Sequence, residues 1–162
     1  MPERIKIIVD VTAQQLFVLH KQQVIQQYSV STATKGTGQQ NGSEQTPLGN
    51  HKIHSKLGGN VPINGVFVGR EFTGEIYSAE LSEQHPKRDW ILTRILWLTG
   101  LEPGFNQQGE VDSLQRYIYI HGTPDSEPMG IPKSHGCIRM RNSDLIKLFQ
   151  QIEIGTEVEI KA

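Results

Sequence analysis

The sequence of 162 residues contains a single cysteine, Cys137, so no internal disulfide can form. The fold therefore does not depend on an oxidising compartment. No apolar stretch approaches the roughly 20 residues that a membrane-spanning helix needs. The first residues also lack the basic start, the apolar core and the small-residue cleavage site of an export signal. We expect a cytoplasmic protein with no membrane partner, although a trimmed periplasmic protein would have the same features.

Charge of one sign is also not in excess, since the formal net charge is −1 at pH 7. No run of lysine and arginine exceeds two residues, whereas proteins that bind nucleic acids concentrate basic charge. We therefore expect no nucleic-acid partner. With 36% hydrophobic and 20% charged residues, the chain has the composition of a soluble globular protein. Residues 1–162 contain no internal repeat, linker or low-complexity tract, which predicts a single domain.

Short runs rich in β-branched and aromatic residues dominate the chain, and clusters of glycine, proline and asparagine separate them. These runs predict strands at 4–11, 14–20, 23–32, 65–69, 91–100 and 116–122, with a closing strand in 155–160. Residues 35–50 form a long Gly-rich segment that predicts a functional or mobile loop. The expected fold class is mainly β.

One helix is clearly predicted, over residues 142–152, with Asn142 or Ser143 as its N-terminal cap. Its apolar positions fall on one face at helical spacing: Leu145, Leu148, Phe149 and Ile152. A second, short helical turn is expected within residues 81–89, where Pro86 would end it.

The stretch SHGCIRM, residues 134–140, places Cys137 after a glycine and a histidine. A thiol attacks as its thiolate, and a free cysteine with a pKa of about 8.5 is only a few per cent ionised at neutral pH. An imidazole that takes the proton removes this obstacle. His121 ends the apolar run YIYIHG and is a candidate base. Gly136 would let backbone amides approach the reacting carbon as an oxyanion hole.

Two other interpretations of Cys137 remain open at this point. A lone cysteine is often an inert, packed residue, although the polar, glycine-containing half of SHGCIRM suits an exposed turn better. A zinc site made from His121, His135 and Cys137 is the other alternative. The spacing is unlike that of zinc-binding motifs, and neither a second cysteine nor an HExxH pattern is present. We therefore expect no metal.

Other polar and aromatic residues carry weaker signals. His51 and His54 would face opposite sides of a strand, so we expect surface side chains rather than a shared ligand set. Trp90 and Trp97 lie in or beside an apolar run and are expected in the core. The sequence GTGQQNG at 36–42 is followed by neither Gly-Lys-Ser/Thr nor a helix pattern. No nucleotide or other cofactor is therefore expected.

The histidine-glycine pair at 121–122 and the motif SHGCIR at 134–139 resemble the L,D-transpeptidase catalytic domain family, also called the YkuD domain. The opening VTAQQLFVL, the TPLG at 46–49 and the closing IGTEV also fall where that family has equivalents. The resemblance covers nearly the whole chain. It implies a β-sandwich-like catalytic domain with one or two short helices, and a thioester acyl-enzyme formed on peptidoglycan stem peptides.

The resemblance also assigns roles to individual residues. Cys137 matches the nucleophile, His121 its base, and Gly122 the residue whose backbone carbonyl orients the imidazole. The residues that match the oxyanion and substrate-binding positions are Ser134, His135, Gly136 and Arg139. No cofactor is implied.

The motif does not decide what accepts the acyl group. Water would make the protein an L,D-carboxypeptidase that trims the terminal D-alanine from muropeptide tetrapeptides in peptidoglycan recycling. An amine would make it a periplasmic transpeptidase that forms cross-links. We expect the first, because a cytoplasmic enzyme meets small muropeptides and water is the abundant acceptor. A non-catalytic peptidoglycan-binding module is a third possibility, but a binder has no need of the paired His121 and Cys137. The sequence indicates no oligomeric state.

Overall fold

The computed structural model of the protein describes residues 4–162 and confirms the mainly β fold. In chain order the elements are β1 (Ile5–Asp10), β2 (Gln15–His20), β3 (Gln23–Ser31), β4 (Gly49–Leu57), β5 (Gly65–Val68), β6 (Glu71–Ile76), α1 (Ala79–Gln84), β7 (Ile91–Gly100), the 3-10 turn η1 (Gly109–Val111), β8 (Tyr119–Gly122), β9 (Ile138–Met140), α2 (Asn142–Gln151) and β10 (Glu157–Lys161). Neither α1 nor α2 is long and apolar enough to cross a membrane, and no other α-helix is described in residues 4–162.

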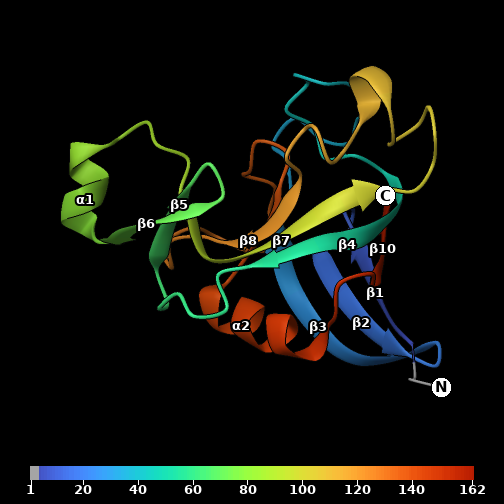
Figure 1. Cartoon of the computed structure of the whole chain (residues 1–162), viewed down its shortest axis with the longest axis horizontal. Coiled ribbons are helices and arrows are strands. Elements are labelled where there is room, and N and C mark those ends of the chain that lie inside the picture. Colours follow the sequence, from blue (N-terminus) through green and yellow to red (C-terminus); the bar gives the residue numbers. More distant parts are fainter. Residues whose placement is uncertain (1–3) are drawn as a thin grey trace.

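All the described strands belong to one sheet with the order β4-β10-β1-β2-β3-β9-β8-β7-β5-β6. An additional pairing between β4 and β7 closes the sheet on itself, so the layers of the sandwich-like fold are parts of one continuous sheet (Figure 1). Strand β7 is long enough to pair with two strands along one edge. Its first residues, Ile91 and Leu92, pair with β5, and residues 95–100 pair with β4.

The core lies inside this closed sheet, where alternate residues of each strand point inward. Ile120 of β8 and Ile138 of β9 are fully buried there. Helix α2 covers the core from one side (Figure 1) and contributes Leu145 and Leu148, as its apolar spacing predicts. The predicted side-chain cap of this helix is wrong. The N-cap position belongs to Arg141 and no side chain caps it, because the side chain of Asn142 is committed elsewhere.

Three strands were not predicted from the sequence: β4, β6 and β9. The prediction that His51 lies at the surface is also wrong, since the residue is fully buried in β4. Its Nδ1 atom lies 3.0 Å from the Gly49 carbonyl oxygen and its Nε2 atom 2.8 Å from Ser113 Oγ, so both ring nitrogens are satisfied. His54 does face the opposite way and is exposed. Trp97 is half-buried and packs beside the core, not in it.

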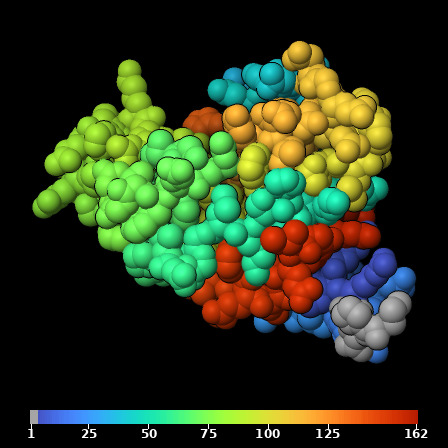
Figure 2. Space-filling view, in the orientation of Figure 1, coloured from blue at the N-terminus to red at the C-terminus, as the bar shows by residue number. Residues whose placement is uncertain are grey.

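Residues 65–90, here called the arm, leave the closed sheet as β5, β6 and α1 and return at β7. Figures 1 and 2 show the arm projecting from one side of the molecule. The hydroxyl of Ser78 accepts a hydrogen bond from the Leu81 amide and so caps α1. The helix ends before His85 and Pro86, as expected for residues 81–89, although it begins two residues earlier.

Candidate active site

The candidate residues gather on one face of two neighbouring strands. Strands β8 and β9 run parallel, with Ile120 beside Ile138 and His121 beside Arg139. Because side chains alternate along a strand, the two isoleucines enter the core while His121 and Arg139 share the opposite face. Cys137 directly precedes β9 and falls on the same face, diagonal to His121. Parallel pairing of two short strands therefore brings together residues that stand 16 positions apart.

The thiol of Cys137 is held by backbone groups at the start of β8. Its Sγ atom donates to the Tyr117 carbonyl oxygen and accepts from the Tyr119 amide, both at 3.4 Å. The residue is partly exposed, yet burial of the sulfur raises the pKa of the thiol to about 12. The Tyr119 amide acts in the opposite direction, because it stabilises the thiolate. At neutral pH the resting sulfur is therefore a protonated thiol.

His121 is almost completely buried, and its Nδ1 atom lies 2.6 Å from the backbone oxygen of Gly122. A carbonyl can only accept, so Nδ1 carries the hydrogen and the neutral ring keeps its lone pair on Nε2. Burial lowers the pKa of His121, while Asp89 and the Gly122 carbonyl oppose that shift. The imidazole is therefore a neutral base with a fixed orientation, as a partner of a thiol requires.

Gly122 is fixed by a network that the sequence did not reveal. A Cβ at this position would collide with Asn142 Oδ1 and the Leu92 carbonyl oxygen. The Asn142 amide donates to the Thr123 carbonyl at 3.0 Å, and its Oδ1 atom accepts from the Thr93 hydroxyl at 2.7 Å. Thr93 sits at a register shift in β7 with φ +75°, a strained conformation for a β-branched residue. Through this bulge, Thr93 of β7 hydrogen-bonds to Asn142 of α2, and Asn142 in turn holds the backbone turn at Gly122 and Thr123 that orients His121.

The turn before the thiol is shaped by Ser134 and Gly136. The Ser134 hydroxyl donates to the Cys137 carbonyl at 2.6 Å and accepts from the Gly136 amide at 3.2 Å. Gly136 has φ +129°, a conformation that favours glycine. The buried hydroxyl of Thr46, from the loop expected to be functional, donates to the Gly136 carbonyl at 2.9 Å. These bonds fix the backbone around Cys137 from both sides of the turn.

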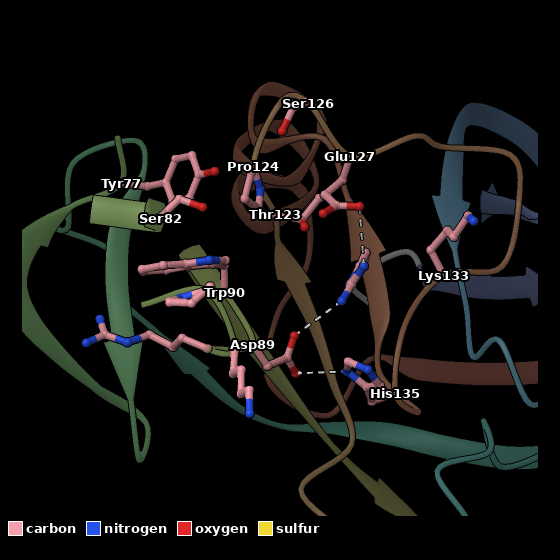
Figure 3. Close-up of a pocket in the computed structure, with 14 residues that line it drawn as sticks. Tyr77, Ser82, Asp89, Trp90, Thr123, Pro124, Ser126, Glu127, Lys133 and His135 are labelled. Carbon is pink, nitrogen blue, oxygen red and sulfur yellow. Dashed lines mark hydrogen bonds and ion pairs between the residues drawn. The ribbon is translucent and has the colours of Figure 1, made fainter. Parts of the chain in front are cut away.

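Arg139 and His135, the other two predicted site residues, meet a carboxylate of the arm (Figure 3). Arg139 is 8% exposed, and its Nη2 atom lies 3.2 Å from Asp89 Oδ1. Its Nη1 atom lies 3.8 Å from Glu127 Oε2, while its buried Nε atom has no hydrogen-bond partner among the described residues. His135 is exposed, and its Nδ1 atom lies 3.8 Å from Asp89 Oδ2. No sequence pattern singled out Asp89 or Glu127.

A groove of about 430 Å³ runs beside these residues, between the arm and the segment that follows β8 (Figure 3). Thr123 and Pro124 form part of one wall, and Tyr77 and Trp90 part of the other. Basic side chains outnumber acidic ones in the lining: Lys87, Arg88, Lys133 and Arg139 against Asp89 and Glu127. The groove can therefore hold a short peptide with a free carboxylate.

The other end of β8 is filled by side chains. The guanidinium of Arg70, in the turn between β5 and β6, lies 5.0 Å from the Trp97 ring centroid and 4.6 Å from that of Tyr117. Its Nη1 atom donates to the Tyr119 hydroxyl at 3.2 Å. These residues are here called the Arg70 cluster. None of its members was predicted as a site residue.

The arrangement supplies parts that acyl transfer needs: a thiol, an oriented imidazole and a fixed backbone turn beside the thiol. Across residues 4–162, no three His, Cys, Asp or Glu side chains are grouped so that they could hold a metal ion. His121, His135 and Cys137 thus form no such group, and one ring nitrogen of His121 is already bound to a carbonyl.

Curated relatives match this chain over about a quarter of its length. The probable L,D-transpeptidase YbiS of Escherichia coli is 43% identical over 44 residues, which are 27% of this chain and 14% of YbiS. The putative L,D-transpeptidase YqjB of Bacillus subtilis is 51% identical over 45 residues, 28% of this chain and 26% of YqjB. These matches thus span only a small part of either relative.

Solved structures share the fold over the whole chain. L,D-transpeptidase 3 of Mycobacterium tuberculosis superposes with a TM-score of 0.61 at 14% identity, covering 99% of this chain and 62% of that one. An L,D-transpeptidase of Mycobacterium smegmatis gives 0.58 at 14% identity, covering 99% and 59%. The family model of the L,D-transpeptidase catalytic domain, YkuD, matches residues 4–160. The chain therefore belongs to the L,D-transpeptidase catalytic domain (YkuD) family.

Proposed function

We propose that this protein is a cysteine-dependent L,D-carboxypeptidase. It would remove the terminal D-alanine from muropeptide tetrapeptides through a thioester acyl-enzyme, in peptidoglycan recycling. Membership of the YkuD family supports a peptidoglycan stem peptide as the substrate. In this proposal Cys137 is the nucleophile, His121 its base and Gly122 the residue that orients the base. Ser134, His135, Gly136 and Arg139 shape the oxyanion and substrate sites.

The reaction would proceed in two stages. His121 Nε2 takes the proton of Cys137, and the sulfur attacks the carbonyl carbon that precedes D-alanine. The S–C bond forms, the C–N bond breaks, and the protonated imidazole gives its proton to the leaving amine. Water then attacks the thioester with His121 again as the base, the C–S bond breaks, and the imidazolium returns the proton to Cys137 Sγ. In this proposal the oxyanion of each stage is stabilised by backbone amides of the turn around Cys137, other than the Gly136 amide, which donates to Ser134 Oγ.

The observation that carries the choice of hydrolysis is the asymmetry of the site. One groove is lined by His135 and Arg139, each two positions from Cys137, and its basic lining suits the carboxylate of a terminal D-alanine. At the other end of β8, Arg70 packs on Trp97 and Tyr117 and donates to the Tyr119 hydroxyl, and in this proposal the cluster leaves no dedicated cleft for a second peptide there. A transpeptidase must hold an amine close enough to compete with concentrated water, which takes a dedicated acceptor cleft.

Mass spectrometry of the products tests the proposal. The purified protein is incubated with a disaccharide tetrapeptide, alone and with a second stem peptide as amine acceptor. We expect free D-alanine and the tripeptide in both reactions, with cross-linked dimer as a minor product. The Cys137→Ala variant is the control and should form neither. Dimer as the main product would reject hydrolysis and leave the family assignment standing.

The alternative is an L,D-transpeptidase that forms cross-links in the periplasm. It is favoured by the similarity to YbiS and YqjB, which are described as a probable and a putative L,D-transpeptidase. The two functions also differ in their setting. A carboxypeptidase of muropeptides is proposed for the cytoplasm, where free turnover fragments are available. Fractionation of cells that express the native gene tests this location, and recovery of the protein from the periplasm would favour the transpeptidase.

A further inference from the structure

Asp89 lies where the arm returns to the closed sheet, two residues before β7. Its side chain is 42% exposed and faces the groove. Figure 3 shows its carboxylate directed away from the arm, toward His135. The residue thus belongs to a different part of the chain from the catalytic strands but contacts them.

A single carboxylate joins the two residues that flank the thiol. Asp89 Oδ1 lies 3.2 Å from Arg139 Nη2, and Asp89 Oδ2 lies 3.8 Å from His135 Nδ1. His135 and Arg139 each stand two positions from Cys137, one before it and one after it. Arg139 is also the cross-strand neighbour of His121. Asp89 therefore contacts neighbours of both members of the proposed catalytic pair.

Few charged groups face the buried His121. Strand β9 presents Arg139 and Cys137, the segment before β7 presents Asp89, and the register partner on β7 is the apolar Ile95. The acceptor at Nδ1 is the uncharged carbonyl of Gly122, so no carboxylate is bonded to the ring. Burial and Arg139 lower the pKa of His121, and Asp89 raises it. Of the charged side chains that shift the pKa of His121, Asp89 is the acidic one.

We propose that Asp89 is a positioning residue for the reaction: it fixes Arg139 and His135 around Cys137, and its charge stabilises the imidazolium that His121 becomes. This proposal rests on the proposed function. In a Ser-His-Asp triad, a carboxylate bonded to the histidine fills the second role. Here the His121 ring is bonded to the Gly122 carbonyl. The Asp89 carboxylate is instead paired with Arg139, the cross-strand neighbour of His121.

The charge matters at one defined point of the reaction. When the proton moves from Cys137 Sγ to His121 Nε2, a second positive charge appears beside the buried guanidinium of Arg139. The two cations repel each other in a region with little water. Asp89 opposes the thiolate that forms in the same step. The thiolate charge is consumed when the S–C bond forms, whereas the imidazolium persists, and Asp89, at 3.2 Å from Arg139, offsets the repulsion until the imidazolium gives its proton to the leaving amine. Glu127 contributes less to this balance, because it lies 3.8 Å from Arg139 and does not act on His121.

An NMR titration of the His121 ring tests the charge without any turnover. All proteins carry Cys137→Ala, and the added changes are Asp89→Asn, Asp89→Glu and the control Glu83→Gln. Glu83→Gln removes the same charge from an exposed position of α1. We expect Asp89→Asn to lower the pKa of His121 by about 0.5 to 1 unit, a three- to tenfold change in proton affinity. Asp89→Glu should restore most of the shift, and Glu83→Gln should leave the titration unchanged.

Asp89→Ser is a second neutral variant of different size and must shift the titration in the same direction. It keeps the test decisive if Asp89→Asn does not fold. Identical titration of His121 in the parent and in the neutral variants, including an absence of protonation in all of them, overturns the proposal. Because the NMR titration measures no reaction, its result remains valid even if the protein releases no D-alanine and the proposed function fails.

Enzyme kinetics with an intact Cys137 supply a second test. Asp89→Asn should lower kcat for D-alanine release by about three- to tenfold, and because Asp89 lines the groove its effect on KM is measured separately. The acidic limb of kcat/KM should move to lower pH, because the neutral imidazole persists to lower pH. A role limited to holding the arm in place would reduce the rate equally at every pH. An unmoved acidic limb therefore counts against the charge, and rescue by Asp89→Glu supports it.

Discussion

The Nδ1 atom of His121 lies 2.6 Å from the backbone oxygen of Gly122, and this contact fixes the tautomer of the ring. The hydrogen must sit on Nδ1, so Nε2 is the basic atom on the face shared with Cys137. A backbone carbonyl cannot titrate, unlike the carboxylate of a triad. The orientation of the base is therefore maintained at every pH at which the fold persists.

Replacement of Cys137 by alanine tests the proposed nucleophile. We expect D-alanine release to fall below detection, because no other thiol exists in the chain. The free energy of unfolding should change by no more than about 1 kcal/mol, since the side chain is small and partly exposed. Product analysis and chemical denaturation measure the two effects. Retention of most of the activity would eliminate Cys137 as the nucleophile.

The pH dependence of alkylation tests the resting protonation state of the thiol. Burial raises the pKa of Cys137 to about 12 and lowers that of His121, so the resting pair is uncharged. The rate of reaction with iodoacetamide should therefore rise about tenfold per pH unit from pH 7 to 10, without a plateau. A plateau near pH 6 would instead reveal a thiolate-imidazolium pair.

The base itself is tested by His121→Ala. Turnover of the muropeptide should fall by at least about 100-fold at neutral pH, because the thiol proton has no acceptor. The steep rise of alkylation with pH should persist, since that reaction depends on the thiolate fraction alone. Rate measurements of both reactions on the same preparation separate loss of the base from loss of the fold. An unchanged turnover rate would exclude His121 from the chemistry.

Much of the fold was predictable because its strands obey simple patterns. The apolar alternation of β1, the long run of β7 and the stripe on α2 all follow from which side chains enter one core. Strand β4 was missed because its residues His51–Lys56 are mostly polar, although the strand pairs on both edges. Strand β9 has only three residues, too few for periodicity to be detected, and its partners are distant in sequence.

The candidate site was predictable where its residues are contiguous in the chain. The motif around Cys137 and the pair at His121 could be identified because their spacing is local. Asp89 and Arg70 could not, since single charged residues in the arm carry no pattern that links them to β8 or β9. Asn142 was interpreted as a helix cap, a common use of asparagine. Its side chain instead bonds to groups 19 and 49 residues away.

Thr93→Val tests the network that holds Gly122. The change keeps the shape of the side chain but removes the hydroxyl that donates to Asn142 Oδ1 and accepts from the Asn64 amide. We expect a loss of about 1–3 kcal/mol in the free energy of unfolding, because both partners are left unsatisfied. Thr99→Val makes the same change at a half-buried position of β7 and should cost much less. Equal losses in the two variants would contradict the network.

The last prediction concerns the buried His51, whose pKa is lowered to about 4 chiefly by burial. In the unfolded chain the same imidazole has a pKa near 6.5, so the folded state binds fewer protons between pH 6.5 and 4. Stability is therefore complete above about pH 6.5 and is lost as the pH falls through this window, by about 3 kcal/mol in total.

Denaturant unfolding at a series of pH values measures this loss. His51→Gln has no titratable ring, so its stability should decline less steeply between pH 6.5 and 4, even if it is lower at neutral pH. The exposed His54 provides the control, and His54→Gln should retain the slope of the parent protein. Parallel curves for His51→Gln and the parent would show that His51 does not govern the acid sensitivity, and that its bonds to Gly49 and Ser113 survive protonation of the ring.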